Sequence, residues 1–449
     1  MKIYKALTIA GSDSSGGAGI QADLKTFSAF QVYGMTVITA LTAQNTMTVK
    51  GIHPIPPEFI KLQFEAVVED IGVDAAKTGM LYSEEIIDIV AEEISIRKIP
   101  LIVDPVMIAK SKAKLLKDEA IKALKEKLIP IAKIVTPNIP EAEEMVKHKI
   151  KGLEDMKRAA IDIKSMGVGA VIIKGGHLEG GKVIDLLYYD DLFYENEKRR
   201  IETKNTHGTG CVFSAALTAL IARKVSIPEA FRIASEFMDK SIIEGLNIGR
   251  GYGPVNPMAK LYEEANRYNA WINVLKALEK IEETKELAEL IPEVRMNIGE
   301  AIPNAKSIKD VCAIDGRITV VNGFPRANGQ VKFGASKHIA NVILSAMEID
   351  PNMRAAMNIK YSEEILEACR RAGFKIAEFK RKEEPLEIKL IEGGTLKWGV
   401  KKAIEDLGET PDVIYDLGEI GKEAMIRIIG INAEDVVNKA TKIIKKLRI

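Results

Sequence analysis

Short apolar runs alternate with amphipathic stretches along roughly the first 260 residues. The runs lie at 6–10, 101–103, 134–135 and 171–173, and each is followed by a glycine-rich loop, a helical pattern or a turn signal. Continuous apolar strands that alternate with helices are typical of a mostly parallel sheet covered by helices on both faces. We therefore predict an α/β domain, interrupted by a polar hairpin at 182–204.

A cluster of glycine and proline at 249–257 predicts the end of this domain. The predicted domains are 1–258 and 259–449. The second begins with a helical pair whose apolar positions predict core: Trp271, Leu275, Leu278 and Ile281. Strand-like pieces at 318–321, 388–391 and 413–415 then alternate with helices near 337–348 and 362–372. The second domain is therefore predicted to be a smaller α/β unit.

Composition narrows the function classes. The chain has 449 residues, 47% of them apolar, and a net charge of +1, so no charge excess favours nucleic acid or a membrane surface. Three cysteines are too few and too scattered for a disulfide framework or a zinc site. With no signal peptide or spanning apolar run, we expect a cytoplasmic protein that acts on small molecules and forms a homo-oligomer.

Two glycine-rich loops precede predicted helices in the first domain. Residues 11–19 follow the first strand, and residues 205–210 lead into a small-residue helix that begins near Cys211. Such loops direct backbone N–H groups at one point, and the helix start adds positive charge, which suits a phosphate. The alternative for the second loop is a tight turn with a buried cysteine. Two such loops suggest that one holds a nucleotide and the other covers a small substrate.

Polar residues stand at the ends of three predicted strands. Asp104 follows the run at 101–103, Asn138 and Glu141 follow 134–135, and Lys174 follows 171–173. The oxygen atoms of the first three suit Mg²⁺, and Lys174 suits a nucleotide phosphate. Singly, each has a structural alternative: a turn-forming aspartate, a charge in a first helical turn, or a surface lysine. Together they favour phosphoryl transfer.

Five motifs carry a specific resemblance over about the first 255 residues. They stand at 10–23, 39–46, 77–80, 103–107 and 205–211. With them the chain resembles the hydroxymethylpyrimidine/phosphomethylpyrimidine kinases of the ribokinase-like superfamily, which act in thiamine biosynthesis. Plain pyridoxal kinases share much of this pattern.

The resemblance implies a set of roles in the first domain. Cys211 takes the place of the aspartate that is the general base elsewhere in the superfamily, and a helix start is expected to ease ionisation of its thiol. Gln44 is expected to bind the aminopyrimidine ring through its amide. The remaining implied residues are Gly11, Asp23 and Met80 for the substrate; Lys174, Thr206, Gly208 and Gly210 for ATP; and Asp104, Asn138 and Glu141 for Mg²⁺.

The second domain lacks a nucleotide loop but is rich in basic and polar residues next to glycines. Its candidates for gripping phosphates are Arg317, Arg326, Ser336, Lys337, His338 and Asn358. The alternative is a solvated basic rim with one hydrogen-bonded histidine.

Residues 263–449 resemble the archaeal-type thiamine-phosphate synthase domain. The match rests on the motifs at 292–297, 334–338, 354–360 and 411–418. It implies that Arg317 and His338 are catalytic and that pyrimidine diphosphate and thiazole phosphate condense to thiamine phosphate and pyrophosphate. Two alternatives are a domain that senses thiamine phosphate and a domain that only drives oligomerisation.

Overall fold

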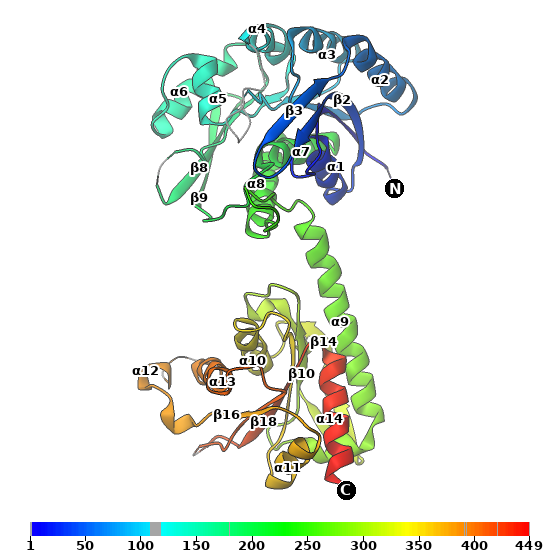
Figure 1. Ribbon diagram of the computed structural model, residues 1–449, viewed down its shortest axis with the longest axis vertical. Coiled ribbons are helices and arrows are strands. Elements are labelled where there is room, and N and C mark those ends of the chain that lie inside the picture. Colours follow the sequence, from blue (N-terminus) through cyan, green and yellow to red (C-terminus); the bar gives the residue numbers. More distant parts are fainter. Residues whose placement is uncertain are drawn as a thin grey trace. The chain divides into compact units, whose positions relative to one another are not determined.

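The computed structural model describes residues 2–107, 118–178, 180–389, 391, 393–419 and 421–448. It divides into two compact units, 1–261 and 262–449, each with its own apolar core (Figure 1). Helix α9 (Ala259–Glu283) begins in the first unit and continues into the second.

The first unit is built on a nine-stranded sheet with the strand order β3-β2-β1-β4-β5-β6-β7-β8-β9. Neighbours from β2 to β7 run parallel, while β3, β8 and β9 join antiparallel at the two edges. The strands are β1 (Lys5–Asp13), β2 (Tyr33–Gln44), β3 (Val49–Pro54), β4 (Ala75–Thr78), β5 (Leu101–Val103), β6 (Ile134–Val135), β7 (Val171–Ile173), β8 (Lys182–Tyr189) and β9 (Leu192–Arg199). The predicted α/β fold, with its mostly parallel sheet and its hairpin, is confirmed.

Helices cover both faces of this sheet (Figure 1). They are α1 (Gly19–Ala29), α2 (Pro57–Asp70), α3 (Glu84–Arg97), α4 (Asp118–Ala123), α5 (Ile139–Val146), α6 (Leu153–Lys164), α7 (Thr209–Ala222) and α8 (Ile227–Ile243). Strand β5 shows why the central strands are apolar throughout. Its Leu101 and Val103 enter the core under α2, α3, α5 and α6, whereas Ile102 enters the core under α1, α7 and α8.

The second unit has a seven-stranded sheet with the order β14-β11-β10-β15-β18-β17-β16. Only β16 and β17 pair in parallel among the described strands of this sheet. Its strands are β10 (Ile298–Ala301), β11 (Val311–Ile314), β14 (Val331–Phe333), β15 (Ala355–Lys360), β16 (Ile376–Glu378), β17 (Val413–Asp416) and β18 (Met425–Gly430), with a separate hairpin of β12 (Ile318–Val321) and β13 (Phe324–Ala327). The helices after α9 are α10 (Lys337–Met347), α11 (Glu363–Arg371), α12 (Leu386–Lys389), α13 (Gly394–Leu407) and α14 (Ala433–Leu447).

Two predicted elements of this unit are wrong. The apolar run at 388–391 predicts a strand, but Leu386–Lys389 is a short helix, and residue 390 lies outside the described residues. A run this short fits either structure, and its flanks decided against a strand. The predicted helical pair is one long helix, α9, followed by a 3-10 turn at Lys285–Leu290. On α9, Ile281 is buried as predicted, but Trp271 is 37% exposed and its indole N–H donates to the Val331 carbonyl.

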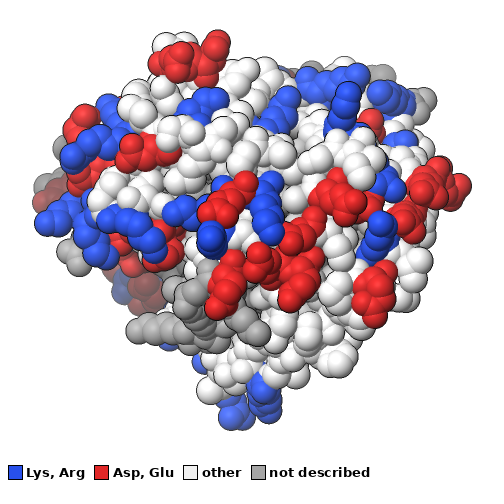
Figure 2. Space-filling view, turned by 90° about the horizontal axis from the view of Figure 1, so that it is seen from above, with Lys and Arg blue, Asp and Glu red and all other residues white. Residues whose placement is uncertain are grey.

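The surface carries both signs of charge. In the face that Figure 2 shows, lysine and arginine side chains are interspersed with aspartate and glutamate. No helix among the described residues has the length and apolar character needed to cross a membrane.

Candidate active sites

The two glycine-rich turns of the first unit touch each other. Gly208, which precedes α7, has a left-handed backbone with a φ of 82°. A Cβ atom on Gly208 would lie 2.0 Å from the carbonyl oxygen of Gly17, in the turn before α1. Because neither backbone can give way by that much, position 208 requires glycine. The turns therefore form one continuous surface beyond the carboxyl end of β1.

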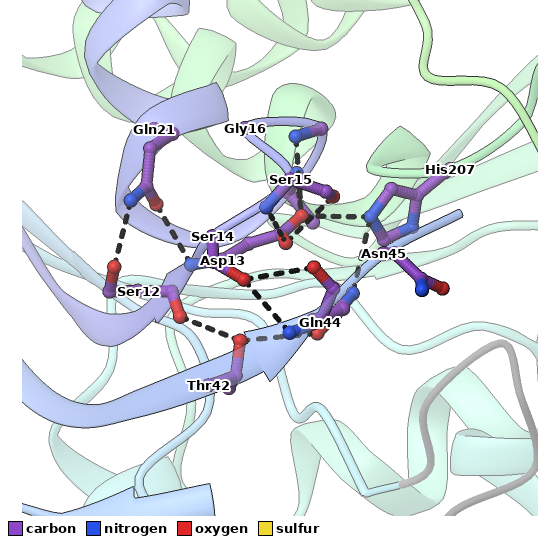
Figure 3. A network of polar contacts seen from close by, with 12 residues as sticks. Ser12, Asp13, Ser14, Ser15, Gly16, Gln21, Thr42, Gln44, Asn45 and His207 are labelled. Atoms are coloured by element: carbon purple, nitrogen blue, oxygen red, sulfur yellow. Dashed lines mark hydrogen bonds and ion pairs between the residues drawn. The ribbon is translucent and has the colours of Figure 1, made fainter. Parts of the chain in front are cut away.

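A polar network fixes this surface (Figure 3). Nε2 of His207 lies 2.9 Å from Oδ2 of Asp13, and the backbone N–H groups of Ser15 and Ala18 donate to the same carboxylate. Burial acts to raise the pKa of Asp13, but hydrogen bonds from His207 and Ser15 outweigh it and lower that pKa to about 2. Gln44, at the end of β2, places its Nε2 3.3 Å from Nε2 of His207. Asp13 and His207 were not among the predicted site residues, although both stand in the glycine-rich motifs at 10–23 and 205–211.

The glycine and proline cluster at 249–257 packs against the same region. His207 donates its backbone N–H to the Gly253 carbonyl and accepts from the N–H of Val255. A Cβ on Gly251 would lie 2.1 Å from the carbonyl oxygen of Thr46. This cluster was expected to mark the domain boundary, and the first unit ends at residue 261, four residues beyond it. The cluster itself packs against the loop around His207.

Two of the predicted pyrimidine residues adjoin each other next to this network. A Cβ on Gly11 would lie 3.0 Å from Cε of Met80, and Thr39 donates to the Met80 carbonyl at 2.6 Å. The backbone around Met80 is thus anchored to β2, which also carries Gln44 at its end.

Asp23, which was predicted to contact the substrate, lies on α1. Its side chain is fully buried, with Oδ1 2.9 Å from Nζ of Lys77 and Oδ2 2.6 Å from the Thr8 hydroxyl. Both carboxylate oxygens of Asp23 therefore have partners within the protein. Lys77 is equally buried. Burial acts to lower the pKa of Lys77, but the charges of Asp23, Cys211 and Asp104 together with the hydrogen bond to Asp23 raise that pKa above its usual value.

Cys211 is half-buried in the first turn of α7. The expected lowering of its thiol pKa is wrong for this structure, because burial raises the pKa of Cys211 to about 12. Lys77 acts in the opposite direction, whereas Asp23 and Asp104 add to the rise. A helix start and one lysine thus do not offset the loss of water together with two nearby carboxylates.

The predicted Mg²⁺ residues are brought near Lys174. Oδ1 of Asp104 lies 3.0 Å from Nζ of Lys174. Burial and the charge of Asp104 raise the pKa of Glu141 to about 7, although Lys174 opposes the rise. Asn138 has another task, because its side chain accepts from the N–H of Glu141 in a capping box at the start of α5. Within the described residues, no group of three or more His, Cys, Asp or Glu is arranged around a common metal position.

The residues predicted for the ATP phosphates partly converge. A Cβ on Gly210 would lie 3.3 Å from Oδ2 of Asp104 and 3.5 Å from Nζ of Lys174, so the start of α7 meets the end of β7. Thr206 stands just before His207, and its backbone N–H donates to the Lys204 carbonyl. Backbone N–H groups and a lysine at one point suit a phosphate group.

In the second unit three of the predicted residues, Ser336, Lys337 and His338, lie at the start of α10. Ser336 caps α10 by accepting from the N–H of Ile339, and Lys337 and His338 form the first turn. Burial and nearby Arg427, Arg317 and Arg381 lower the pKa of His338 to about 3, although Asp416 opposes them. The imidazole is therefore neutral at physiological pH, next to Arg317.

The side chains of Arg326 and Asn358, which were also predicted to bind phosphate, make hydrogen bonds within the protein. Arg326 donates to the Glu282 carbonyl at the end of α9. Asn358 is buried, accepts from the N–H of Asn297 and donates to the Arg295 carbonyl. The buried residues Arg381, Arg427 and Asp416 were not among the predicted site residues. Asp416 lies in the motif at 411–418, and the charge of Arg427 inside the strand at 425–430 was the other available signal.

Comparisons with known proteins agree with this division. A family model described as phosphomethylpyrimidine kinase matches residues 13–256, and one described as thiamine-phosphate synthase ThiN matches residues 273–442. The bifunctional thiamine biosynthesis protein ThiDN of Methanocaldococcus jannaschii is 35% identical over 446 residues, covering 98% of each chain. The chain belongs to this bifunctional family. Its first domain is a hydroxymethylpyrimidine/phosphomethylpyrimidine kinase, and its second is a ThiN-type thiamine-phosphate synthase.

Relatives of the kinase domain extend the comparison. The hydroxymethylpyrimidine/phosphomethylpyrimidine kinase of Bacillus subtilis is 51% identical over 261 residues, which is 58% of this chain and 96% of that protein. An ADP complex of Bacillus subtilis pyridoxal kinase is 40% identical, with a TM-score of 0.55 over 57% of this chain and 98% of that one. Pyridoxal kinase of Staphylococcus aureus, solved with AMP-PCP and pyridoxal, is 38% identical with a TM-score of 0.54, over 57% of this chain and 95% of that one. The ribokinase-like fold and both family resemblances are confirmed.

Proposed function

We propose that the kinase domain transfers the γ-phosphate of ATP to the pyrimidine alcohol and then to its monophosphate, with Cys211 as the proton acceptor. The observation that carries this proposal is the junction of the two glycine-rich turns with Gly210, Lys174 and Asp104. Backbone N–H groups and Lys174 stand ready to hold phosphates there. The ADP and AMP-PCP complexes of the related kinases support ATP as the donor.

The ring of the substrate is expected to lie against Gly11 and Met80, with the amide of Gln44 at its polar edge. As the hydroxyl oxygen attacks the γ-phosphorus, its proton passes to the sulfur of Cys211. The thiol must first ionise, and Lys77 is the buried cation that favours this. Asp23 is assigned to holding Lys77 in place rather than to contact with the substrate.

Magnesium is proposed as the metal of the kinase reaction. Asp104 and Glu141 fit it, because two buried carboxylates repel each other strongly enough to help raise the pKa of Glu141 to about 7. When bound, Mg²⁺ would neutralise charge on the phosphates. Asn138 contributes by shaping the start of α5, where its capping box positions Glu141.

For the synthase domain we propose that Arg317 and His338 act on the departing pyrophosphate. The bond between the pyrimidine methylene and the diphosphate oxygen breaks, the electron pair leaves on pyrophosphate, and the thiazole nitrogen forms the new bond. Cationic groups that stabilise the leaving anion are what this reaction requires.

One assay tests both steps. Purified full-length protein is mixed with hydroxymethylpyrimidine, ATP, magnesium and thiazole phosphate, and the products are separated by chromatography. We expect pyrimidine diphosphate and then thiamine phosphate. Pyrimidine diphosphate without thiamine phosphate would instead favour a C-terminal domain that senses thiamine phosphate or only drives oligomerisation.

A further inference from the structure

A buried cluster of charges stands at the end of β17, outside the predicted residues. Asp416 is fully buried and accepts from Nε of Arg381 at 2.5 Å and from Nη1 of Arg427 at 2.8 Å. Arg381 is 8% exposed and Arg427 is 1% exposed. Both guanidinium groups lie over the ring of Phe379, at 5.8 and 5.5 Å from its centre. One carboxylate thus orients two arginines from different segments of the chain.

The charges at this place do not balance. The charged groups that act most strongly on His338 are Arg427, Arg317, Arg381 and Asp416. Three of them are positive and one is negative, and the imidazole between them is neutral. The first turn of α10, which carries His338, adds partial positive charge from its backbone N–H groups. These groups therefore carry more positive than negative charge.

Two buried polar atoms here have no hydrogen-bond partner among the described residues. They are Nε of Arg427 and Nε2 of His338. An unpaired buried donor or acceptor costs about 1–3 kcal/mol. Two arginines on one carboxylate can be a purely structural triad. A structural triad, however, does not account for the buried imidazole of His338, whose Nε2 has no partner among the described residues.

We propose that Arg381 and Arg427, held in position by Asp416, complete with Arg317 and His338 a binding site for the diphosphate group of the pyrimidine substrate. This inference rests on the proposed function of the synthase domain. Asp416 orients the two arginines but cancels only one of their charges, so a positive charge is left for the ligand. Arg427 does not need to contact the ligand directly. Its guanidinium is buried, so water and salt screen its positive charge only weakly. Arg381, the less buried of the two, lies nearer the solvent side.

The first test measures inhibition of thiamine phosphate formation by pyrophosphate in the full-length protein, with pyrimidine diphosphate and thiazole phosphate supplied. Arg381→Met should raise the inhibition constant of pyrophosphate at least tenfold and lower kcat/KM for the diphosphate by a similar factor. The KM for thiazole phosphate should change less than twofold. Arg381→Lys, which keeps the charge, should fall between. The control is Arg370→Met, because Arg370 is an exposed residue of α11 that pairs with Glu367.

The second test uses protein in which Arg381, Arg427 and Asp416 are unchanged. It therefore remains valid even if Arg381→Met does not fold. The ring signals of His338, assigned with a His338→Gln variant, are followed by NMR as pH is varied with and without pyrophosphate. We expect the pKa of His338 to rise by at least one unit when pyrophosphate binds, because an adjacent anion favours the imidazolium. An unchanged His338 titration at saturating pyrophosphate, or a folded Arg381→Met protein with unchanged inhibition, would show the triad to be structural. If the wild-type protein forms no thiamine phosphate, the proposed function fails, whereas these two results bear on the site alone.

Discussion

Around Cys211 in the kinase domain every buried lysine faces a carboxylate, whereas around His338 in the synthase domain the cations outnumber their partners. Lys77 pairs with Asp23 at 2.9 Å, and Lys174 pairs with Asp104 at 3.0 Å. Because each of these lysines is already paired, the positive charge that a triphosphate needs must come from backbone N–H groups and Mg²⁺ as well as from Lys174.

In the synthase site the positive charges are not matched one to one by carboxylates. Three arginines act on His338 and a single carboxylate, Asp416, opposes them. A site in which positive groups outnumber negative ones is suited to stabilise a leaving group that departs with the bonding electron pair and so gains one negative charge. The difference indicates that the kinase domain prepares a proton acceptor, while the synthase domain prepares a place for a leaving group.

The largest expected effect is on the kinase thiol. Cys211→Ala should lower both phosphorylation rates by roughly 10²–10⁴-fold, because a general base typically contributes that much. Thiamine phosphate formation from supplied pyrimidine diphosphate should be unchanged, and Cys312→Ala is the control in the other domain. Kinase turnover within a few-fold of wild type would show that the thiol only fills space.

The pKa of the thiol gives a second test. Since burial raises the pKa of Cys211 to about 12, the reactive thiolate should grow about tenfold per pH unit below that value. Iodoacetamide labelling of Cys211 in the unliganded protein, followed by mass spectrometry, should therefore be about 100-fold faster at pH 10 than at pH 8. Circular dichroism at pH 10 checks that the fold persists. A labelling rate that levels off near pH 7 would show instead that the pKa of Cys211 is low, as the helix start led us to expect.

A smaller effect is expected at the ring-binding amide. Gln44→Leu removes both polar atoms of the amide at similar volume, which costs about 1–3 kcal/mol and should raise the KM for hydroxymethylpyrimidine roughly 5- to 150-fold. The KM for ATP should hardly move. The matched control, Gln330→Leu, alters an exposed residue of the other domain and should change neither constant. Equal rises in both constants would mean that Gln44 supports the fold of the loop instead.

The smallest change is expected when the domains are separated. A fragment of residues 1–258 should keep kinase activity within a few-fold, and a fragment of residues 259–449 should keep synthase activity, because the apolar cores do not mix. A fragment of residues 1–248 is the contrasting control. It lacks the segment that binds His207 and Thr46, so its kinase activity should fall sharply. Equal activity of the two N-terminal fragments would contradict the role given to that segment.

The sequence predicted most of the first fold and part of each site. Periodicity found the parallel sheet because its central strands are buried on both faces, as β5 shows. It failed at 388–391, where three apolar residues in a run of four fit a strand and a helix turn equally well. Motifs predicted Gln44 and Cys211, but whether a thiol is ionised depends on how much water and charge surround it.

The sequence did not predict which buried charged residues pair with each other. Asp23 and Lys77 are 54 residues apart, and nothing in either segment says that they meet in the core. The same holds for Arg381 and Asp416, which are 35 residues apart. A single sequence gives the sign of each charge, but it does not show which charged side chains are buried next to one another in the folded protein.

The pairing of Asp13 with His207 has a consequence for when the kinase becomes active. These residues are 194 positions apart, and closing a loop of that length costs about 5 kcal/mol in chain entropy. One hydrogen-bonded pair cannot offset this, so the sheet and α7 must dock before the two turns meet. During synthesis the ribosome releases Asp13 early and the segment at 249–257 nearly last of this domain. A growing chain therefore carries an unfinished substrate loop until the whole first domain has emerged, and activity should arise in one late step.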